Sequence, residues 1–243
     1  MKLLILITLF TSCALNLQTK KNQGMNSSIQ EFRYTDFSGI YNLKREVKLD
    51  KGKLITRVKL FSGSDELEST VSVSKFGSSS KSSNKYLLPS ISQFKVWFNK
   101  KEYFSQIKID RKTRKLEVLM KSPDEKWQGK KEFDLPKTSY ICFFSQIPEC
   151  LKSQELLLKA ARGDLGLYII WDNYPYQLEQ FNEVPSAPFF YATVKLDGYE
   201  KNIVKYTLDI GNQIVSFHFD KNLKYTRMFW VSQGISSISS LKE

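Results

Sequence analysis

The sequence has one histidine and three cysteines among its 243 residues. Zinc and haem sites need histidine and cysteine ligands at short, regular spacings, and the chain has no CxxC pair or other metal-spaced set. It also lacks a GxSxG elbow, an HExxH helix and a phosphate-binding glycine loop. We therefore expect a non-enzymatic protein with no metal and no cofactor.

The remaining catalytic candidates are few. His218 alternates with Val215, Phe217 and Phe219, which predicts a solvent-facing histidine on a strand. The adjacent acids at 65–66 and 124–125 fall in turn-like stretches and are typical of loops. A carbohydrate-directed hydrolase is the remaining enzymatic alternative, and it would need two carboxylates about 5–10 Å apart in one cleft.

Long apolar runs are also absent, apart from one at the N-terminus. Lys2 precedes the apolar residues 3–10, and the small pair Thr11-Ser12 stands before Cys13. This is the pattern of a secretory signal, and the run is too short to cross a bilayer core that needs roughly 20 residues. It resembles the lipobox of bacterial lipoproteins, although Phe10 stands where that pattern prefers leucine.

The resemblance implies removal of residues 1–12 and attachment of lipid (palmitate) to Cys13. The membrane would then be a partner through this lipid, and Ala14 in place of an aspartate implies the outer rather than the inner membrane. Two alternatives stay open. One is a simple signal peptide with an incidental cysteine, and the other is a start at Met25 that leaves the protein in the cytosol.

Composition divides the rest of the chain into a tether and a body. Residues 13–30 are polar and without periodicity, so we expect a lipidated flexible tether that reaches roughly 20–25 Å. Residues 31–243 form one predicted β-rich domain, because 41% of the chain is hydrophobic and 14% aromatic. Cys142 and Cys150 are a predicted disulfide, which suits an exported protein. The alternative is two reduced cysteines that pack as small apolar residues.

Alternation with a period of two dominates the body. One face of a predicted strand carries Leu43, Arg45, Val47 and Leu49, and the chain returns after Gly52. Similar hairpins are predicted over 107–120 and at a turn formed by Asp197-Gly198. The sequence thus predicts a mainly β fold, a curved antiparallel sheet or open barrel of roughly ten strands, with one central α-helix over 149–162. This architecture is similar to the lipoprotein-carrier families of the bacterial periplasm.

The segment 168–191 is rich in aromatic residues and stiffened by prolines. Aromatic rings with polar tips suit a ligand-binding or partner-binding surface. The alternative is that they pin this segment over the sheet edge and the helix. As a surface, the segment and the helix would cover a groove in the C-terminal half, and a loop should tolerate alanine in place of its aromatics. The candidate residues are Trp171, Tyr174, Tyr176, Phe181, Phe189 and Tyr191.

The net charge of the chain indicates which classes of partner it can bind. The chain has 37 Lys and Arg against 25 Asp and Glu, a net charge of +12. This favours a phospholipid, a glycolipid or an anionic envelope polymer, and export excludes nucleic acid. A solvated, soluble strand face explains the same charges.

The combined expectation is a lipid-anchored cell-envelope protein that binds a lipid or glycolipid or assists envelope assembly. The alternative is a structural or adaptor lipoprotein that docks on another envelope protein or on an acidic polysaccharide. An apolar internal void would favour the first, and a filled core with an exposed aromatic patch would favour the second.

Overall fold

The computed structural model describes residues 27–240, except 80–81, 138–139, 177–186 and 212. The fold is mainly β, and its strands form one sheet of fifteen strands. Every pair of neighbouring strands is antiparallel except β9 and β10. The predicted curved antiparallel sheet is therefore confirmed, but the estimate of roughly ten strands is too low. Short strands such as β9 and β15 hold too few residues to show a period of two.

The sheet has two parts, which we call the N-leaf and the C-leaf. The N-leaf consists of β1 (Ser28–Asp36), β2 (Gly39–Asp50), β3 (Lys53–Ser62), β4 (Asp65–Ser79), β5 (Ser82–Phe98), β6 (Lys101–Asp110), β7 (Lys115–Lys121) and β8 (Gly129–Asp134). The C-leaf consists of β9 (Ile141–Phe143), β10 (Leu165–Ile170), β11 (Phe189–Glu200), β12 (Ile203–Ile210), β13 (Gln213–Asp220), β14 (Tyr225–Trp230) and β15 (Ile235–Ser239).

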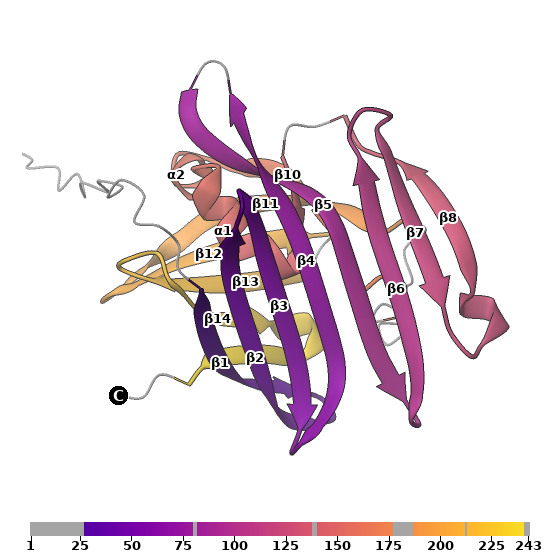
Figure 1. Cartoon of the computed structure of the whole chain (residues 1–243). Helices are drawn as coiled ribbons and strands as arrows, with labels where there is room; N and C mark the ends of the chain where they lie inside the picture. The colour runs from indigo at the N-terminus through magenta and orange to yellow at the C-terminus, as the bar shows by residue number, and fades with distance from the viewer. Residues whose placement is uncertain (1–26, 80–81, 138–139, 177–186, 212, 241–243) are drawn as a thin grey trace, which may run out of the picture.

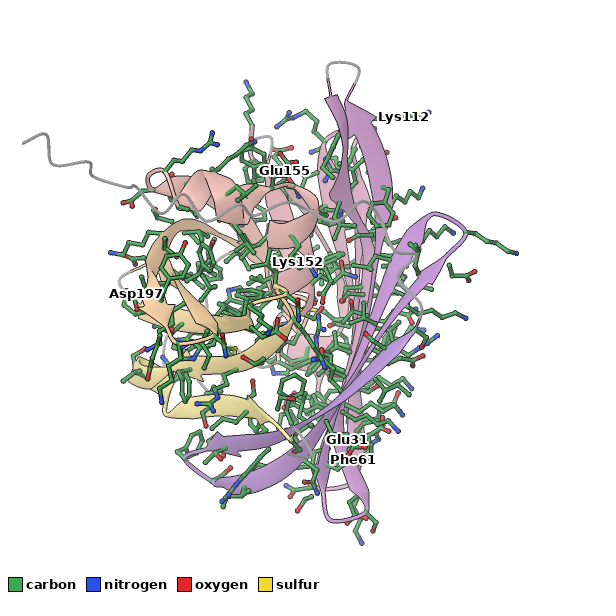
Figure 2. All side chains as sticks on the ribbon, turned by 90° about the vertical axis from the view of Figure 1, so that its left-hand side faces the viewer. Glu31, Phe61, Lys112, Lys152, Glu155 and Asp197 are labelled. Atoms are coloured by element: carbon green, nitrogen blue, oxygen red, sulfur yellow. A yellow bond between two sulfur atoms is a disulfide. The ribbon has the colours of Figure 1, made fainter. Side chains whose placement is uncertain are left out.

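The two leaves are joined by the first and last strands of the described chain. β1 pairs with β15, so that Phe32 lies opposite Ser239, and the strand order runs from β8 through β1 and β15 to β9. The N-leaf strands stand steeply in Figure 1, and the C-leaf strands cross behind them. Figure 2 shows the leaves from the side, with the helical segment beside both of them near the labels Lys152 and Glu155. The sheet thus folds over on itself and encloses its core.

Alternation explains the two faces of the N-leaf. Val47, Leu54 and Ile107 point inward and are buried. The outward positions carry charges that pair across neighbouring strands, such as Lys59 with Glu66 at 2.6 Å. Similar pairs join Arg57 to Glu46, Lys95 to Glu102, Lys115 to Glu132 and Lys130 to Glu117. Such pairing is expected of a solvated strand face.

The expected hairpins over 43–60 and 107–120 are present as β2–β3 and β6–β7. The prediction of a turn at Asp197-Gly198 is wrong. β11 continues to Glu200, and the register between β11 and β12 shifts between Leu196 and Gly198. This glycine marks a β-bulge, a second role that glycine has within strands.

The single helix predicted over 149–162 is also wrong. A 3-10 turn, η2 (Phe144–Gln146), leads into α1 (Ile147–Ser153), and α2 (Leu156–Ala160) follows. Glu155, with a φ of 54°, separates the two helices. Gln154 is held at this break, because its side-chain amide donates to the carbonyl of Leu87 at 3.3 Å. This contact with β5 lies beyond the reach of a local helical pattern.

Cys142 of β9 and Cys150 of α1 form a disulfide, as expected, with their Cα atoms 6.1 Å apart. The bond holds α1 against β9, the edge strand of the C-leaf. At the other end of the chain, β1 begins at Ser28, so the last three residues of the predicted 13–30 tether belong to the sheet. Cys13 and the predicted signal peptide lie outside the described residues. Within the described ranges, no helix is long and apolar enough to span a membrane.

Candidate functional site

A cavity of about 130 Å³ lies between the two leaves, beside the start of α1. The N-leaf, the C-leaf and the segments around η2 and after β10 all contribute to its wall. Its lining is mostly apolar and aromatic, with a few polar groups: Tyr34, Leu43, Arg45, Val58, Leu60, Glu68, Thr70, Phe144, Ser145, Pro148, Asp172, Asn173, Phe217, Tyr225, Met228, Trp230, Ile235 and Ser237.

Strand register explains the N-leaf part of this wall. Arg45 lies opposite Val58, which in turn lies opposite Thr70, and these three form one row across β2, β3 and β4. The neighbouring row contains Glu68 at the equivalent place on β4. Because alternate residues of a strand share a face, both rows point into the cavity, two residues apart along each strand.

Arg45 is the basic residue of the cavity lining and is only 4% exposed. Its Nη2 atom forms an ion pair with Glu149 and donates to the carbonyl of Ser145 at 3.1 Å. The guanidinium lies 5.7 Å from the ring centroid of Tyr225. Its Nη1 atom is buried and has no hydrogen-bond partner among the described residues. A buried N–H group without an acceptor is costly, so this atom lowers the stability that the ion pair provides.

A second unpaired group comes from the residues that follow β10. Asn173 lines the cavity, is 7% exposed, and its Oδ1 atom has no partner in the described part of the chain. An amide oxygen accepts hydrogen bonds. Arg45 and Asn173 thus each carry one buried polar atom without a partner in the described part of the chain.

The neighbouring Asp172 serves a different purpose. Its carboxylate accepts from the hydroxyl of Ser72 at 2.8 Å and from the backbone N–H of Ser145 at 3.1 Å. Burial raises the pKa of Asp172, and these hydrogen bonds act in the opposite direction. Asp172 thus fastens the segment after β10 to both the N-leaf and η2.

We call η2 (Phe144–Gln146) the plug, because its side chains fill the space between the leaves beside the cavity. Gln146 is 1% exposed, and its amide nitrogen donates to the carbonyl of Ser72 at 2.9 Å. It also donates to the hydroxyl of Thr56 at 3.3 Å, and its oxygen accepts from Ser74. These bonds explain why serines and a threonine, rather than apolar residues, line this part of the N-leaf.

Glu68 is the cavity acid that has no ion pair or hydrogen bond to its carboxylate among the described residues. Burial, with a smaller contribution from Asp36, raises its pKa from 4.5 to about 7. Tyr34 lies nearby, and its pKa is also raised, by burial first and then by Glu68. Ser72, which holds Asp172, is four residues along β4 from Glu68, roughly 13 Å between Cα atoms. The two acids therefore occupy different surroundings.

Five of the six aromatic residues chosen from the sequence are among the described residues, and none of these five lines the cavity. Trp171, Tyr174 and Tyr176 are each 2–3% exposed. Trp171 stacks on Trp230 with ring centroids 5.2 Å apart. The hydroxyl of Tyr176 donates to backbone carbonyls of the N-leaf, including Phe104 at 3.1 Å. These rings pin the segment to the sheet, which is the alternative that the sequence left open.

Of the other three candidates, the two that the structure describes both lie on β11 and both contact the ring of Tyr168. Phe189 is half-buried at the start of β11, where it lies edge-on to Tyr168. Tyr191 is 58% exposed and covers Gly166, where an added Cβ would lie 2.1 Å from the Tyr191 hydroxyl oxygen. Phe181 lies outside the described residues. The cavity differs from the groove expected in the C-terminal half, since β2, β3 and β4 of the N-leaf line it together with residues of β13 and β14.

His218 lies on the outer face of β13, as expected from alternation, but is half-buried rather than fully solvent-exposed. Its ring lies 5.2 Å from that of Phe229, and burial lowers its pKa. It is not part of the cavity wall. The structure also contains no group of three or more metal-ligating side chains among the residues it describes.

Comparisons with known proteins give little further information. No family model and no curated protein matches the chain. Among solved structures, the chain is similar to a β-barrel-like protein of the domain of unknown function DUF1849 from Brucella abortus. The match has a TM-score of 0.48 and 10% identity, and it covers 87% of this chain and 94% of that one. A likeness at this level carries no argument about function.

Proposed function

We propose that this chain is a non-enzymatic, lipid-anchored cell-envelope protein whose inter-leaf cavity binds a lipid or glycolipid. The observation that supports this best is the cavity itself, whose walls are mostly apolar and aromatic. Protein interiors are usually packed as tightly as organic crystals. A space of about 130 Å³ with such walls is thus better explained by a ligand than by structure alone.

The position of the plug supports a binding role. Its hydrogen bonds to β3 and β4 hold Phe144 and Ser145 at the cavity wall, while Asp172 holds the segment that carries Asn173. A site whose polar groups are fixed in advance loses less conformational entropy when a ligand binds. The plug, together with Ser72 and Ser74 that bind it and Asp172, thus preorganises the cavity.

The envelope location rests on the sequence. The resemblance of residues 1–13 to a lipobox supports export and lipid attachment at Cys13. A disulfide between Cys142 and Cys150 is compatible with this proposal, because disulfides persist in oxidising compartments outside the cytosol.

The adaptor alternative has less support. The aromatic surface that it requires is largely internal, since Trp171, Tyr174 and Tyr176 are buried. Exposed apolar residues occur elsewhere, notably Phe37 at 77% and Ile40 at 59% near the β1–β2 turn, but they form a small hairpin tip. This tip would present little area to a partner.

The test is mass spectrometry of lipids that copurify with protein extracted from its native membrane. Leu43→Trp places a large ring at the half-buried edge of the cavity and should remove the bound lipid, whereas Tyr191→Ala changes an exposed ring elsewhere and should not. Both variants should keep their melting temperature within a few degrees. A wild-type protein without lipid, or a Leu43→Trp variant that retains it, would favour the adaptor alternative.

A further inference from the structure

We propose that one edge of the molecule docks on the surface of a lipid bilayer, next to the end of the cavity that reaches this edge. We call this edge the apolar rim. It consists of Phe37 between β1 and β2, Ile40 of β2, Ile214 of β13 and Val231 of η4 (Val231–Gln233). The inference rests on the proposed function, since it describes how a lipid-binding cavity meets the membrane that holds its lipid.

Strand register brings the β1–β2 turn beside η4. Ile40 lies opposite Thr35 within the hairpin, and Thr35 lies opposite Ser236 of β15. A single residue separates η4 from the start of β15. The turn that carries Phe37 and the short helix that carries Val231 therefore stand at the same end of the β1–β15 pair.

The start of β13 belongs to the same edge. Val215 of β13 lies opposite Trp230 of β14, and Ile214 and Val231 are the next residues toward the edge. The side-chain oxygen of Gln213 accepts from the indole N–H of Trp230 at 3.0 Å, which fixes the start of β13 beside η4. Four residues from distant parts of the chain thus gather at one place.

The rim holds the two most exposed large apolar side chains among the described residues, Val231 at 78% and Phe37 at 77%. A specific protein interface buries about 800 Å² on each partner, which a few side chains on turns do not supply. A membrane interface needs less, because apolar side chains enter it by only about 5–10 Å. A bilayer therefore suits the rim better than a protein partner does.

The turn that carries Phe37 is ordered by its own polar groups. The carboxylate of Asp36 accepts from the backbone N–H of Ser38 at 2.8 Å and from that of Gly39 at 3.1 Å. The hydroxyl of Ser38 also forms a hydrogen bond with the hydroxyl of Tyr41 at 2.8 Å. The structure thus holds an apolar ring in solvent on a well-bonded turn, which is favourable once another apolar phase covers the ring.

The cavity reaches the rim from both leaves. Trp230 and Ile235, which stand on either side of η4, line the cavity from the C-leaf. Tyr34, three residues before Phe37, lines it from the N-leaf and is half-buried, so this part of the wall is accessible from outside. A lipid that enters or leaves here passes directly between the rim and the cavity.

Two arginines stand behind the rim on the outer face. Arg33 of β1 and Arg227 of β14 are both exposed, and both lie opposite Ile238 of β15. Arg33 is four residues from Phe37 and Arg227 four residues from Val231, roughly 13 Å along each strand. When the rim is immersed, these guanidinium groups come to the level of the lipid phosphates, which they bind well.

A lipid at Cys13 can reach the same bilayer. β1 extends from Ser28 to the rim over nine residues, roughly 30 Å. A fully extended chain of the length of residues 13–27 spans roughly 50 Å. Attachment at Cys13 and docking of the rim are therefore compatible.

The test adds a tryptophan at the rim. Full-length protein with Phe37→Trp is incorporated into phosphatidylcholine vesicles whose brominated acyl chains quench tryptophan fluorescence on contact. Tyr199→Trp is the matched control, because Tyr199 is 55% exposed and lies near the other end of β11, beside the β11–β12 turn. After subtraction of the wild-type signal, we expect Phe37→Trp to lose most of its added fluorescence and Tyr199→Trp to keep its own. The lipid anchor is common to both proteins.

Arg33→Gln tests the contact with the head groups. Phosphatidylglycerol added to the vesicles should increase the quenching of Phe37→Trp. Arg33→Gln in the same chain should remove this increase, whereas Lys48→Gln, an exposed position near the other end of β2, should leave it unchanged.

Absence of quenching in Phe37→Trp, or equal quenching in both tryptophan variants, overturns the docking surface. A wild-type dimer that Phe37→Ser abolishes also overturns it, since a second copy then covers the rim. If lipid still copurifies with the wild type in these cases, the proposed function stands. A wild type that carries no lipid, but whose rim variant is quenched, overturns the lipid-binding role of the cavity alone.

Discussion

Arg45 of β2 and Glu149 of α1 form a largely buried ion pair that ties the N-leaf to the helical segment, with side-chain exposures of 4% and 13%. Replacing Glu149 with alanine leaves the guanidinium buried without its counter-charge. We expect the free energy of unfolding to fall by about 3 kcal/mol, since breaking one side of a buried pair costs several kcal/mol. Urea denaturation of both proteins measures this difference.

The matched control is Glu102→Ala, which breaks the exposed pair with Lys95 on the outer face. Exposed pairs contribute about 0.2–1 kcal/mol, because water and salt screen them. Equal losses in the two variants would show that the Arg45–Glu149 pair has no special role in joining the leaves.

The disulfide gives a second prediction. Cys142 and Cys150 close a short loop, with a sequence separation of 8, between the edge strand β9 and α1. The double serine variant should lose on the order of 2–3 kcal/mol of stability. Denaturation with and without reductant measures this, and the serine variant, which has no bond to reduce, is the control. Labelling of both thiols in the oxidised, exported protein would refute the bond.

The raised pKa of Glu68 predicts how stability depends on pH. In the folded protein the carboxyl group of Glu68 keeps its proton up to about pH 7, whereas in the unfolded chain it loses the proton near pH 4.5. Between these values the folded state binds more protons, so stability falls as the pH rises. Glu68→Gln removes this dependence and should raise stability at pH 8, on the order of 2–3 kcal/mol.

Thermal denaturation from pH 4 to pH 9 tests this prediction. Glu102→Gln, which changes an exposed glutamate of the outer face, is the control and should leave the shape of the pH profile unchanged. If wild type and Glu68→Gln have parallel profiles, the carboxyl group of Glu68 titrates as it does in water.

Much of the sheet was predictable because strand pairing between neighbours in the chain is local. Alternation and turn residues identified β2–β3 and β6–β7, and spacing suggested the bond between Cys142 and Cys150. The break at Glu155 was not predictable, because it depends on a contact between Gln154 and β5 that is distant in sequence.

The cavity illustrates the same limit. Arg45 shares an alternating face with Leu43 and Val47, so a charge on an apolar face was visible in the sequence, but its partner Glu149 was not. On β4 the buried positions are Ser72 and Ser74, while Val71 and Val73 are only half-buried. Hydropathy alone would reverse these faces. The serine hydroxyls are buried because residues more than 70 positions away accept their hydrogen bonds, Gln146 of the plug for Ser74 and Asp172 for Ser72.

Burial changes what is expected of Trp171→Ala. A surface lid would tolerate this change, but Trp171 is 2% exposed and stacks on Trp230 and Phe144. We expect a loss of about 3–5 kcal/mol, the usual cost of removing a large core side chain. Chemical denaturation measures it, with Tyr191→Ala, at 58% exposure, as a control of smaller effect. Similar losses in both variants would contradict the placement of Trp171 in the core.

The envelope proposal predicts that Cys13 is required for membrane attachment. The apolar run that precedes it is too short to hold the chain in a bilayer once the acylation site is gone. Cys13→Ser should therefore leave unprocessed or soluble protein, measured by detergent-phase partitioning and by the mass of the product. Cys142→Ser is the control for loss of a cysteine and should still partition into detergent. Recovery of Cys13→Ser in the detergent phase, at wild-type yield and mature size, would overturn the lipoprotein assignment while leaving the cavity and its ligand to be tested separately.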